Sequence, residues 1–570
     1  MFVIFTLAFG GMTARLFVLQ IVEHPAYALY AVSQRDTEVV LPARRGAILD
    51  RNGEPLAISI DLQTIFTDPA HVENPHRTAE KLAPILGIEA SALEGKLVGT
   101  WPGDRHEYLA RQVEPKVARR VRALDLPGIY LKREPKRYYP GGRLASHLLG
   151  FTNIDGVGLE GIEAQYEDVL QGKAGSMELE QDPAGRPLPQ ADFLYERPKP
   201  GRSLLLTIDK ELQYFTQLTL ADAAQRYHAE SGVAIVMRPR NGEILALANV
   251  PDFDPNRAGK FSDDDRRNRA LTDVYEPGSA YKIVATSGAL EAGVVTPRTT
   301  FTVPDTFPYS DRVFHDSHPH PTEKMTVTEI IEESSNVGTI QIGLKLGAAR
   351  LDRIVRRFGF GSETGLDFPG EVGGIVLDRK DWTGPTIATI PIGQGIAVTP
   401  LQMAAAYSTI ANKGVWVEPK VLASTVGARG QPLTASKPTR RRVVSKRTAR
   451  KMADILTGVV ETGTGIEAQI PGYLTAGKTG TAQKPLPGGG YGNSYVGSFA
   501  GFAPANRPEV VVIVVLDNPS PIWGGATAAP TFRTITQFAL RHLGISPTGN
   551  AERAAREIEA EQAAETATYD

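Results

Sequence analysis

The chain has 570 residues, of which 22% are charged, and its formal net charge is −2. This length allows a large core and several domains, while the balanced charge argues against a nucleic-acid-binding protein. Cysteine is absent, which excludes disulfides, thiol nucleophiles and cysteine metal sites and is compatible with an exported protein.

Residues 1–22 form an apolar stretch. At about 1.5 Å per residue, a helix of this length just crosses a bilayer, so we predict a transmembrane anchor, with a buried helix as the alternative. No Lys or Arg precedes Arg15, whereas Arg44 and Arg45 follow the apolar stretch. This distribution of positive charge is the opposite of the one expected for an exported C-terminal part. A basic cytoplasmic tail missing from the numbered sequence would restore the expected distribution. Ala26-Tyr27-Ala28 offers an alternative signal-peptidase site.

Residues 23–200 carry strand and turn patterns but little chemistry. Asn52-Gly53 lies between two apolar runs and predicts a β-hairpin. Apolar residues then recur at helical spacing, Val113 and Val117 among them, so we expect a small helical lobe inserted at about residues 66–127. A linker rich in proline and glycine ends this part of the chain.

Residues 203–545 have the pattern of one large mixed domain. A helix is predicted over residues 210–229. Two strands follow, at 232–237 and 244–248, and an Asn-Gly turn joins them as a hairpin. The remainder alternates between helical and extended patterns, so we expect an α+β fold.

The stretch from Pro277 to Lys282 pairs a serine with a lysine at the start of a predicted helix. Positions three apart share a helix face, so we expect Lys282 to hydrogen-bond the Ser279 hydroxyl. Free N–H groups and the helix dipole favour negative charge developing at Ser279 and ease Lys282 toward its neutral form. A capping serine beside a solvated lysine is the alternative.

A polar break separates two predicted helices, residues 327–332 and 339–346. It contains Ser334 and Asn336. A hydroxyl and an amide at such a break can relay protons and hold a substrate amide, whereas ordinary helix capping is the alternative.

Gly472 to Thr479 matches the phosphate-loop pattern, which raises the alternative of a nucleotide-binding protein. A helix must follow such a loop, but here prolines and glycines follow and oppose a helix. We therefore expect Lys478 and Thr479 on a strand, followed by a glycine-rich hairpin and strands at 495–502 and 510–516.

Three short patterns stand in one order along the chain: Ser-x-x-Lys at Ser279, Ser-x-Asn at Ser334 and Lys-Thr-Gly at Lys478. This combination is typical of β-lactamases and penicillin-binding proteins, although Ser335 stands where their middle pattern has Asp. The chain resembles the class B penicillin-binding proteins and is most similar to the cell-division transpeptidase among them. The resemblance runs to about residue 545 and also rests on Arg45-Gly-Ala-Ile-Leu-Asp-Arg-Asn-Gly53, Arg137-Tyr-Tyr-Pro-Gly141, Gly158-Leu-Glu-Gly161 and Ala529-Pro-Thr-Phe532.

The resemblance implies a multidomain α+β fold. A single membrane helix at residues 1–22 would precede an elongated, β-rich, non-catalytic pedestal of the dimerisation type at 23–200. A penicillin-binding transpeptidase domain would follow at 203–545, with an antiparallel sheet flanked by helices, and then a low-complexity tail at 546–570 without an assignable role. The anchor would place the protein in the bacterial inner (cytoplasmic) membrane, with the catalytic domain periplasmic or extracellular.

The resemblance also implies a peptidoglycan D,D-transpeptidase that cross-links stem peptides through a serine acyl-enzyme in septal wall synthesis. Donor and acceptor stem peptides would be its substrates and β-lactams its inhibitors. A membrane-embedded glycosyltransferase and division proteins are the implied partners. No cofactor, metal or nucleic acid is expected.

The implied roles fall on eight residues. Ser279 is the nucleophile and Lys282 the base. The backbone N–H groups of Ser279 and Thr481 would hold the oxyanion. Ser334 would donate a proton to the leaving amine, and Asn336 would hold the peptide amide. The strand that binds the carboxylate would consist of Lys478 with Thr479, Gly480 and Thr481.

Four alternatives stay open. They are an elongation-type transpeptidase, a β-lactam sensor or serine β-lactamase, a non-catalytic membrane scaffold for wall-synthesis partners, and a P-loop NTPase. A cluster of His315, His318 and His320 with Asp316 could bind a metal, but in a proline-rich loop such residues are more often polar groups of a surface or cleft.

Overall fold

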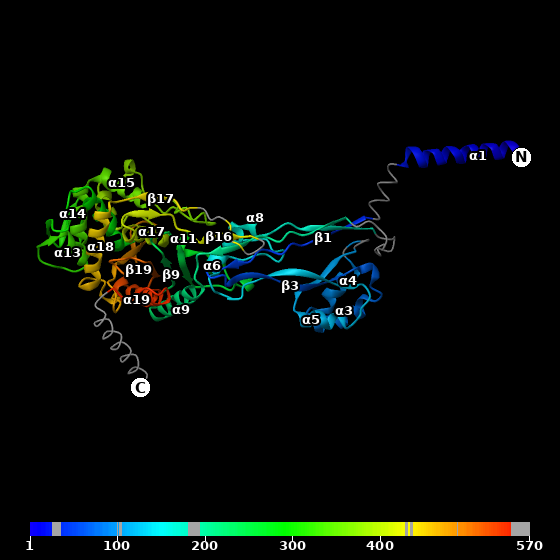
Figure 1. The fold of residues 1–570 in the computed structure, drawn as a ribbon, viewed down its shortest axis with the longest axis horizontal. Coiled ribbons are helices and arrows are strands. Elements are labelled where there is room, and N and C mark those ends of the chain that lie inside the picture. The colour runs from blue at the N-terminus through cyan, green and yellow to red at the C-terminus, as the bar shows by residue number, and fades with distance from the viewer. Residues whose placement is uncertain are drawn as a thin grey trace, which may run out of the picture. The chain divides into compact units, whose positions relative to one another are not determined.

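The structure is a computed structural model that describes residues 1–24, 36–99, 101, 105–180, 194–427, 431, 433, 437–486 and 488–548. Figure 1 shows its helices and strands. The chain divides into two compact units. Unit 1 comprises residues 1–46, 59–137 and 168–202, and unit 2 comprises residues 47–58, 138–167 and 203–570.

The N-terminal helix α1 (Phe2–Phe17) continues through a π-helical turn, η1 (Val18–Val22). These 21 residues have a mean hydropathy of 1.9, and none of them is buried. The helix is long and apolar enough to cross a membrane, in agreement with the predicted anchor. Ala26-Tyr27-Ala28 lies outside the described residues.

Unit 1 contains two sheets. One is antiparallel, with strands β1 (Asp36–Leu41), β6 (Gly175–Glu180) and β7 (Leu194–Glu196) in the order β1-β6-β7. In the other, the end of β3 (Pro55–Thr67) pairs with β4 (Glu107–Val113) and β5 (Ile129–Tyr138). A lobe packs there through buried leucines, and its helices are η2 (Pro69–His71), α3 (Pro75–Leu86), α4 (Ala90–Val98) and α5 (Pro115–Arg122).

The predicted helical run of this lobe is wrong at Val113. Val113 ends strand β4, and α5 begins at Pro115, so Val113 and Val117 do not share a helix. Val113 pairs with Gln63 of β3, which gives it a strand partner that the local sequence does not reveal.

The predicted hairpin at Asn52-Gly53 is confirmed in unit 2. β2 (Ile48–Leu49) pairs with the start of β3 in antiparallel fashion, and Gly53 takes a φ of +87°. The Asp50 carboxylate fixes the turn by accepting from the backbone N–H groups of Asn52 and Glu54, each at 2.8 Å. β8 (Ser203–Leu206) pairs with β2 and with β16 (Leu422–Val426).

The core of unit 2 is a five-stranded antiparallel sheet in the order β10-β9-β20-β19-β18. α9 (Lys210–Arg226) and α19 (Gly524–His542) contribute to its apolar core, and α17 (Pro400–Ala411), which is buried throughout, contacts β9, β19 and β20. The strands are β9 (Ser231–Met237), β10 (Ile244–Val250), β18 (Ala476–Pro485), β19 (Tyr491–Ala503) and β20 (Val510–Asp517). The helix-flanked antiparallel sheet confirms the predicted α+β fold.

Further helices and short hairpins complete unit 2 (Figure 1). The longer helices are α12 (Lys282–Glu291), α13 (Val327–Glu332), α14 (Asn336–Leu346), α15 (Ala348–Phe358) and α18 (Lys446–Glu461). The paired short strands are β11 (Thr300–Val303) with β14 (Glu323–Thr326), β12 (Thr306–Tyr309) with β13 (Arg312–His315), and β15 (Val415–Val417) with β17 (Arg440–Arg442).

Candidate active site

Ser279 lies on a tight turn that precedes helix α12. The sequence predicted an α-helix starting at Ser279, but the structure shows a 3-10 turn, η4 (Gly278–Tyr281), and α12 begins at Lys282. Gly278 takes a φ of +52°, and a Cβ there would lie 2.9 Å from the carbonyl oxygen of Thr481. The close approach of this turn to strand β18 therefore sets the position of Ser279.

Lys282 is fully buried, and its amine meets oxygen atoms of the second motif. Nζ donates to the Ser334 carbonyl oxygen at 2.5 Å and to Asn336 Oδ1 at 2.8 Å, and it lies 3.4 Å from Ser334 Oγ. Burial lowers the pKa of Lys282 to about 7, although the charge of Asp316 opposes this shift. Neutral Lys282 is therefore well populated near pH 7, as a general base must be.

The predicted hydrogen bond between Lys282 and the Ser279 hydroxyl is not formed. Within the described residues, the side-chain hydrogen bonds of Lys282 run to Ser334 and Asn336. A protonated lysine can only donate hydrogen bonds. The carbonyl oxygen of Ser334 and Oδ1 of Asn336 can only accept them, whereas a serine hydroxyl also carries a proton of its own. Catalytic hydrogen bonds of this kind often tighten only when substrate binds.

Ser334 and Asn336 lie at the break between α13 and α14. Ser334 is buried and takes a left-handed φ of +61°, which separates the two helices. Ser335 caps α14 by accepting from the Gly338 N–H at 2.9 Å, so α14 begins at Asn336, three residues before the predicted Thr339. The predicted break is confirmed, and it directs both motif side chains toward Lys282.

Lys478 is the second fully buried lysine of the site. Its Nζ donates to Thr464 Oγ1 and to Thr479 Oγ1, each at 3.2 Å. Burial holds the pKa of Lys478 well below its ordinary value, and the positive charge of Lys282 lowers it further. A substrate carboxylate reaching this lysine would restore its charge and gain a strong, charge-assisted hydrogen bond.

β18 is the edge strand of the sheet, so it can present Thr479, Gly480 and Thr481 to a ligand. A Cβ at Gly480 would meet Ser498 Oγ at 2.3 Å and the Pro277 carbonyl oxygen at 2.9 Å, so glycine is needed for close contact with the serine turn. Thr481 Oγ1 accepts from the Gly524 N–H at 3.1 Å, at the start of α19.

The strand conformation of residues 476–485 overturns the phosphate-loop alternative. Lys478 lies within a strand that pairs with β19, and no helix begins after Thr479 in this described stretch. The helix N-terminus that would hold a nucleotide phosphate is therefore missing at this position.

Asp316 is a functional candidate whose role the sequence did not reveal. Its carboxylate, which is buried, accepts from Ser335 Oγ at 2.7 Å, from the Val337 N–H at 3.0 Å and from the Asn336 N–H. It also contacts His320 Nε2 at 3.1 Å. Asp316 therefore fixes the N-terminus of α14 and the Ser-x-Asn motif; nothing in the local sequence predicts this contact across about 20 residues.

The histidine cluster does not converge. In the part of the chain that the structure describes, no group of three or more His, Cys, Asp or Glu residues is arranged to hold a metal. His320 pairs with Asp316, and the His318 ring lies over Trp523 with centroids 6.1 Å apart.

Thr464, which contacts Lys478, is a second site residue that the local sequence patterns did not reveal.

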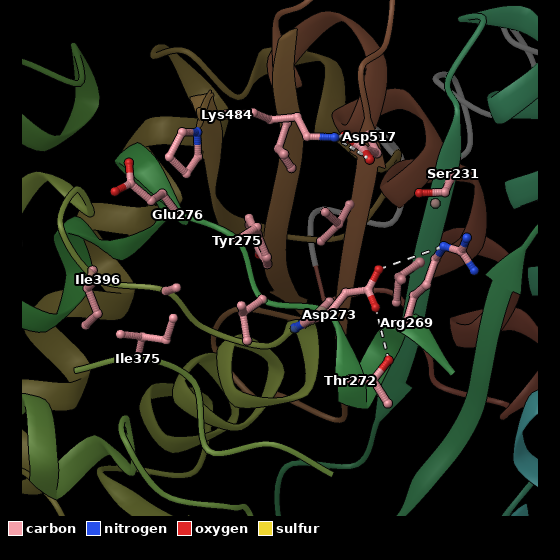
Figure 2. A pocket seen from close by; sticks show the side chains of 18 of the residues that line it. Ser231, Arg269, Thr272, Asp273, Tyr275, Glu276, Ile375, Ile396, Lys484 and Asp517 are labelled. Carbon is pink, nitrogen blue, oxygen red and sulfur yellow. Dashed lines mark hydrogen bonds and ion pairs between the residues drawn. The ribbon is translucent and has the colours of Figure 1, made fainter. Parts of the chain in front are cut away.

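A cavity of about 690 Å³ lies beside the segment that leads to Ser279 (Figure 2). Its rim carries an ion pair between Lys484 Nζ and Asp517 at 2.8 Å. Glu276 accepts from the Gly395 N–H at 2.8 Å and from the Tyr491 hydroxyl at 3.0 Å, and burial raises the pKa of Glu276. These contacts anchor the chain three residues before Ser279.

Residues 232–537 match the penicillin-binding protein transpeptidase domain, and residues 40–206 match the penicillin-binding protein dimerisation domain. The chain belongs to the penicillin-binding proteins. It is 34% identical over 552 residues to the probable peptidoglycan D,D-transpeptidase PenA of Neisseria meningitidis. This match covers 95% of this chain and 91% of that protein. It is 34% identical over 511 residues to the peptidoglycan D,D-transpeptidase FtsI of Escherichia coli, covering 88% and 84% of the two chains.

A solved structure gives the same assignment. Penicillin-binding protein 3 from Mycobacterium tuberculosis, complexed with aztreonam, is similar with a TM-score of 0.71 and 32% identity, covering 90% of this chain and 99% of that chain. The predicted membership of the class B penicillin-binding proteins is confirmed, and all eight predicted site residues fall within the transpeptidase match.

We expect Asp316→Asn to slow penicillin acylation about tenfold to a hundredfold, because an amide cannot accept all the hydrogen bonds that hold the Ser-x-Asn motif. The charge of Asp316 raises the pKa of Lys282, so its removal should also move the rising limb of the pH profile to lower pH. Stopped-flow acylation measured against pH tests both effects. Asp311→Asn, an exposed residue of the same hairpin, is the control; an unchanged rate and midpoint in Asp316→Asn would contradict the role.

Proposed function

We propose that this chain is a peptidoglycan D,D-transpeptidase that cross-links stem peptides through an acyl-enzyme on Ser279. The observation that most supports this proposal is the complete burial of Lys282 next to the Ser-x-Asn motif. This burial lowers the pKa of Lys282 to about 7. A solvated lysine would be protonated and could not act as a base.

In the acylation step, neutral Lys282 takes the Ser279 proton as the oxygen attacks the carbonyl carbon of the penultimate D-Ala. The backbone N–H groups of Ser279 and Thr481 hold the oxyanion, each worth roughly 3 to 4 kcal/mol by analogy with measured hydrolases. Ser334 passes a proton to the leaving amine, and Asn336 holds the peptide amide.

Terminal D-Ala then leaves, and the amine of an acceptor stem peptide attacks the acyl-enzyme. Lys478, with the hydroxyls of Thr479 and Thr481, binds the terminal carboxylate of the donor before this departure. An anionic group is favoured here because Lys478 is fully buried and donates to the hydroxyls of Thr464 and Thr479, which supply no negative charge.

We assign a pedestal to residues 23–200, with its lobe at 66–127, and a transpeptidase domain to residues 203–545. The anchor would hold the transpeptidase domain on the periplasmic or extracellular side, where peptidoglycan lies. A membrane-embedded glycosyltransferase and division proteins are the proposed partners, and a septal role is favoured by the similarity to FtsI.

The test is to incubate the detergent-solubilised protein with penicillin and with a stem pentapeptide. A mass increase of one penicillin that persists for many minutes, together with release of D-Ala when an acceptor amine is present, supports the transpeptidase. Rapid hydrolysis of penicillin would instead indicate a β-lactamase, and a stable adduct without any D-Ala release would indicate a sensor. A fluorescent fusion enriched along the lateral wall rather than the septum would favour an elongation role.

A further inference from the structure

Five arginines surround one hollow of unit 2, outside the site built around Ser279. The hollow has a volume of about 560 Å³, and Asp352 is the one carboxylate among the described residues that line it. α15 and β17 meet there (Figure 1), together with the short helix η5 (Arg379–Asp381). The arginines are Arg353, Arg356 and Arg357 of α15, Arg379 of η5 and Arg441 of β17.

Among the described residues, Arg356 is the one arginine of this hollow that forms an ion pair with a carboxylate, although the charge of Arg357 helps to lower the pKa of Glu291. Arg356 pairs with Asp352 at 3.6 Å and with Asp378 at 3.0 Å. In the part of the chain that the structure describes, no ion pair joins Arg353 or Arg379 to an acidic side chain. Like charges held close together repel one another in the folded state, and a ligand that supplies negative charge would relieve this repulsion.

Some of the donors are already fixed in place. The Arg441 guanidinium lies 3.6 Å over the Trp416 ring, and its Nε donates to the Arg357 carbonyl oxygen at 3.3 Å. Arg357 Nη2 in turn donates to the Arg442 carbonyl oxygen at 3.0 Å. A guanidinium held by stacking loses less conformational freedom when it binds an anion.

The positive surface continues along α15. A second hollow of about 290 Å³ shares Arg353 and Arg357 with the first and adds Arg350. The carboxylate of Glu291 also lines it, but Glu291 already accepts from the Ser445 N–H at 3.0 Å and from Thr448 Oγ1 at 2.5 Å. Positions 350, 353 and 357 recur on one helix face, so Arg350 adds a further positive charge beside the first hollow.

We propose that this arginine hollow, defined by Arg353, Arg356, Arg357, Arg379 and Arg441, binds a phosphate-bearing ligand. Planar guanidinium groups contact phosphate oxygens in bidentate fashion. A concave site with donors on three elements fits a compact group with many oxygens, such as a diphosphate, because each element can contact a different oxygen. A free diphosphate, a phospholipid headgroup and a phosphodiester polymer share this chemistry.

The test measures binding to the full-length protein in detergent by calorimetry. Inorganic pyrophosphate is the first probe, and a short-chain phosphatidylglycerol and a soluble glycerol-phosphate polymer are then compared with it to distinguish the sources. We expect Arg353→Ala and Arg379→Ala each to weaken binding of the preferred probe about tenfold, and the double variant about a hundredfold. Arg353→Lys keeps the charge but loses the bidentate contact, so its affinity should lie between those of Arg353→Ala and the parent.

Arg240→Ala is the control, because Arg240 is an exposed arginine on the hairpin between β9 and β10. Unchanged penicillin labelling in every variant shows that the fold of unit 2 is intact. If an alanine variant loses labelling, the lysine variant at the same position, Arg353→Lys or Arg379→Lys, replaces it. Failure of all three probes to bind, or equal binding by the parent and the double variant, would overturn the proposal. Tighter binding of polyglutamate than of every phosphate probe would overturn the phosphate assignment in favour of an acidic protein segment.

Discussion

Replacing Ser279 with alanine should abolish covalent labelling by penicillin and D-Ala release together. No acyl-enzyme can form without the hydroxyl, and loss of an activated serine in a hydrolase costs on the order of 10⁶-fold in turnover. The free energy of unfolding should change by only about 0.5 kcal/mol, since the Ser279 side chain is half-buried and donates no hydrogen bond within the described residues. Gel fluorescence, an assay of released D-Ala and thermal unfolding measure the three quantities.

Ser334→Ala is the matched control for this experiment. Ser334 contacts Lys282, and its proposed role is only to relay a proton, so its loss should slow labelling about a hundredfold without abolishing it. Full labelling of Ser279→Ala, or a penicillin adduct mapped to another peptide in the parent, would show that the nucleophile is wrongly assigned.

The acylation rate should rise with pH and level off above about pH 7. The neutral amine of Lys282 is the proposed base, and burial lowers the pKa of Lys282 to about 7, so protonation would remove that base as pH falls. Below the midpoint, the rate should fall about tenfold per pH unit. The second-order rate constant for penicillin acylation, measured from pH 5 to pH 9, checks this profile.

Lys282→Ala should lower that rate constant by about 10²- to 10⁴-fold and remove the limb centred near pH 7. Lys282→Arg is the informative partner variant, because arginine stays protonated and should fail as a base although it keeps the positive charge. Lys413→Ala, on the loop after α17, serves as a remote control. A profile in Lys282→Ala that keeps its midpoint would assign the titration to another group.

Local patterns were sufficient where the structure depends on residues close in sequence. The Asn52-Gly53 hairpin, the hairpin of β9 and β10, and the break at Ser334 follow from turn chemistry and hydrophobic periodicity, which act over a few residues. Local patterns failed at Val113, because its strand partner Gln63 lies 50 residues away in the chain. They also placed Ser279 in an α-helix, whereas contact with β18 tightens that turn into a 3-10 helix.

The sequence by itself identified the candidate reacting groups of this protein: a serine, two lysines and the polar residues between them, in an order that is typical of penicillin-binding proteins and β-lactamases. Only the tertiary structure decided how those groups behave. The low pKa of Lys282 comes from its complete burial. The position of Ser335 and Asn336 is fixed by hydrogen bonds to Asp316, which directly follows strand β13. Desolvation and such long-range hydrogen bonds depend on which segments meet in space, which a local pattern does not encode.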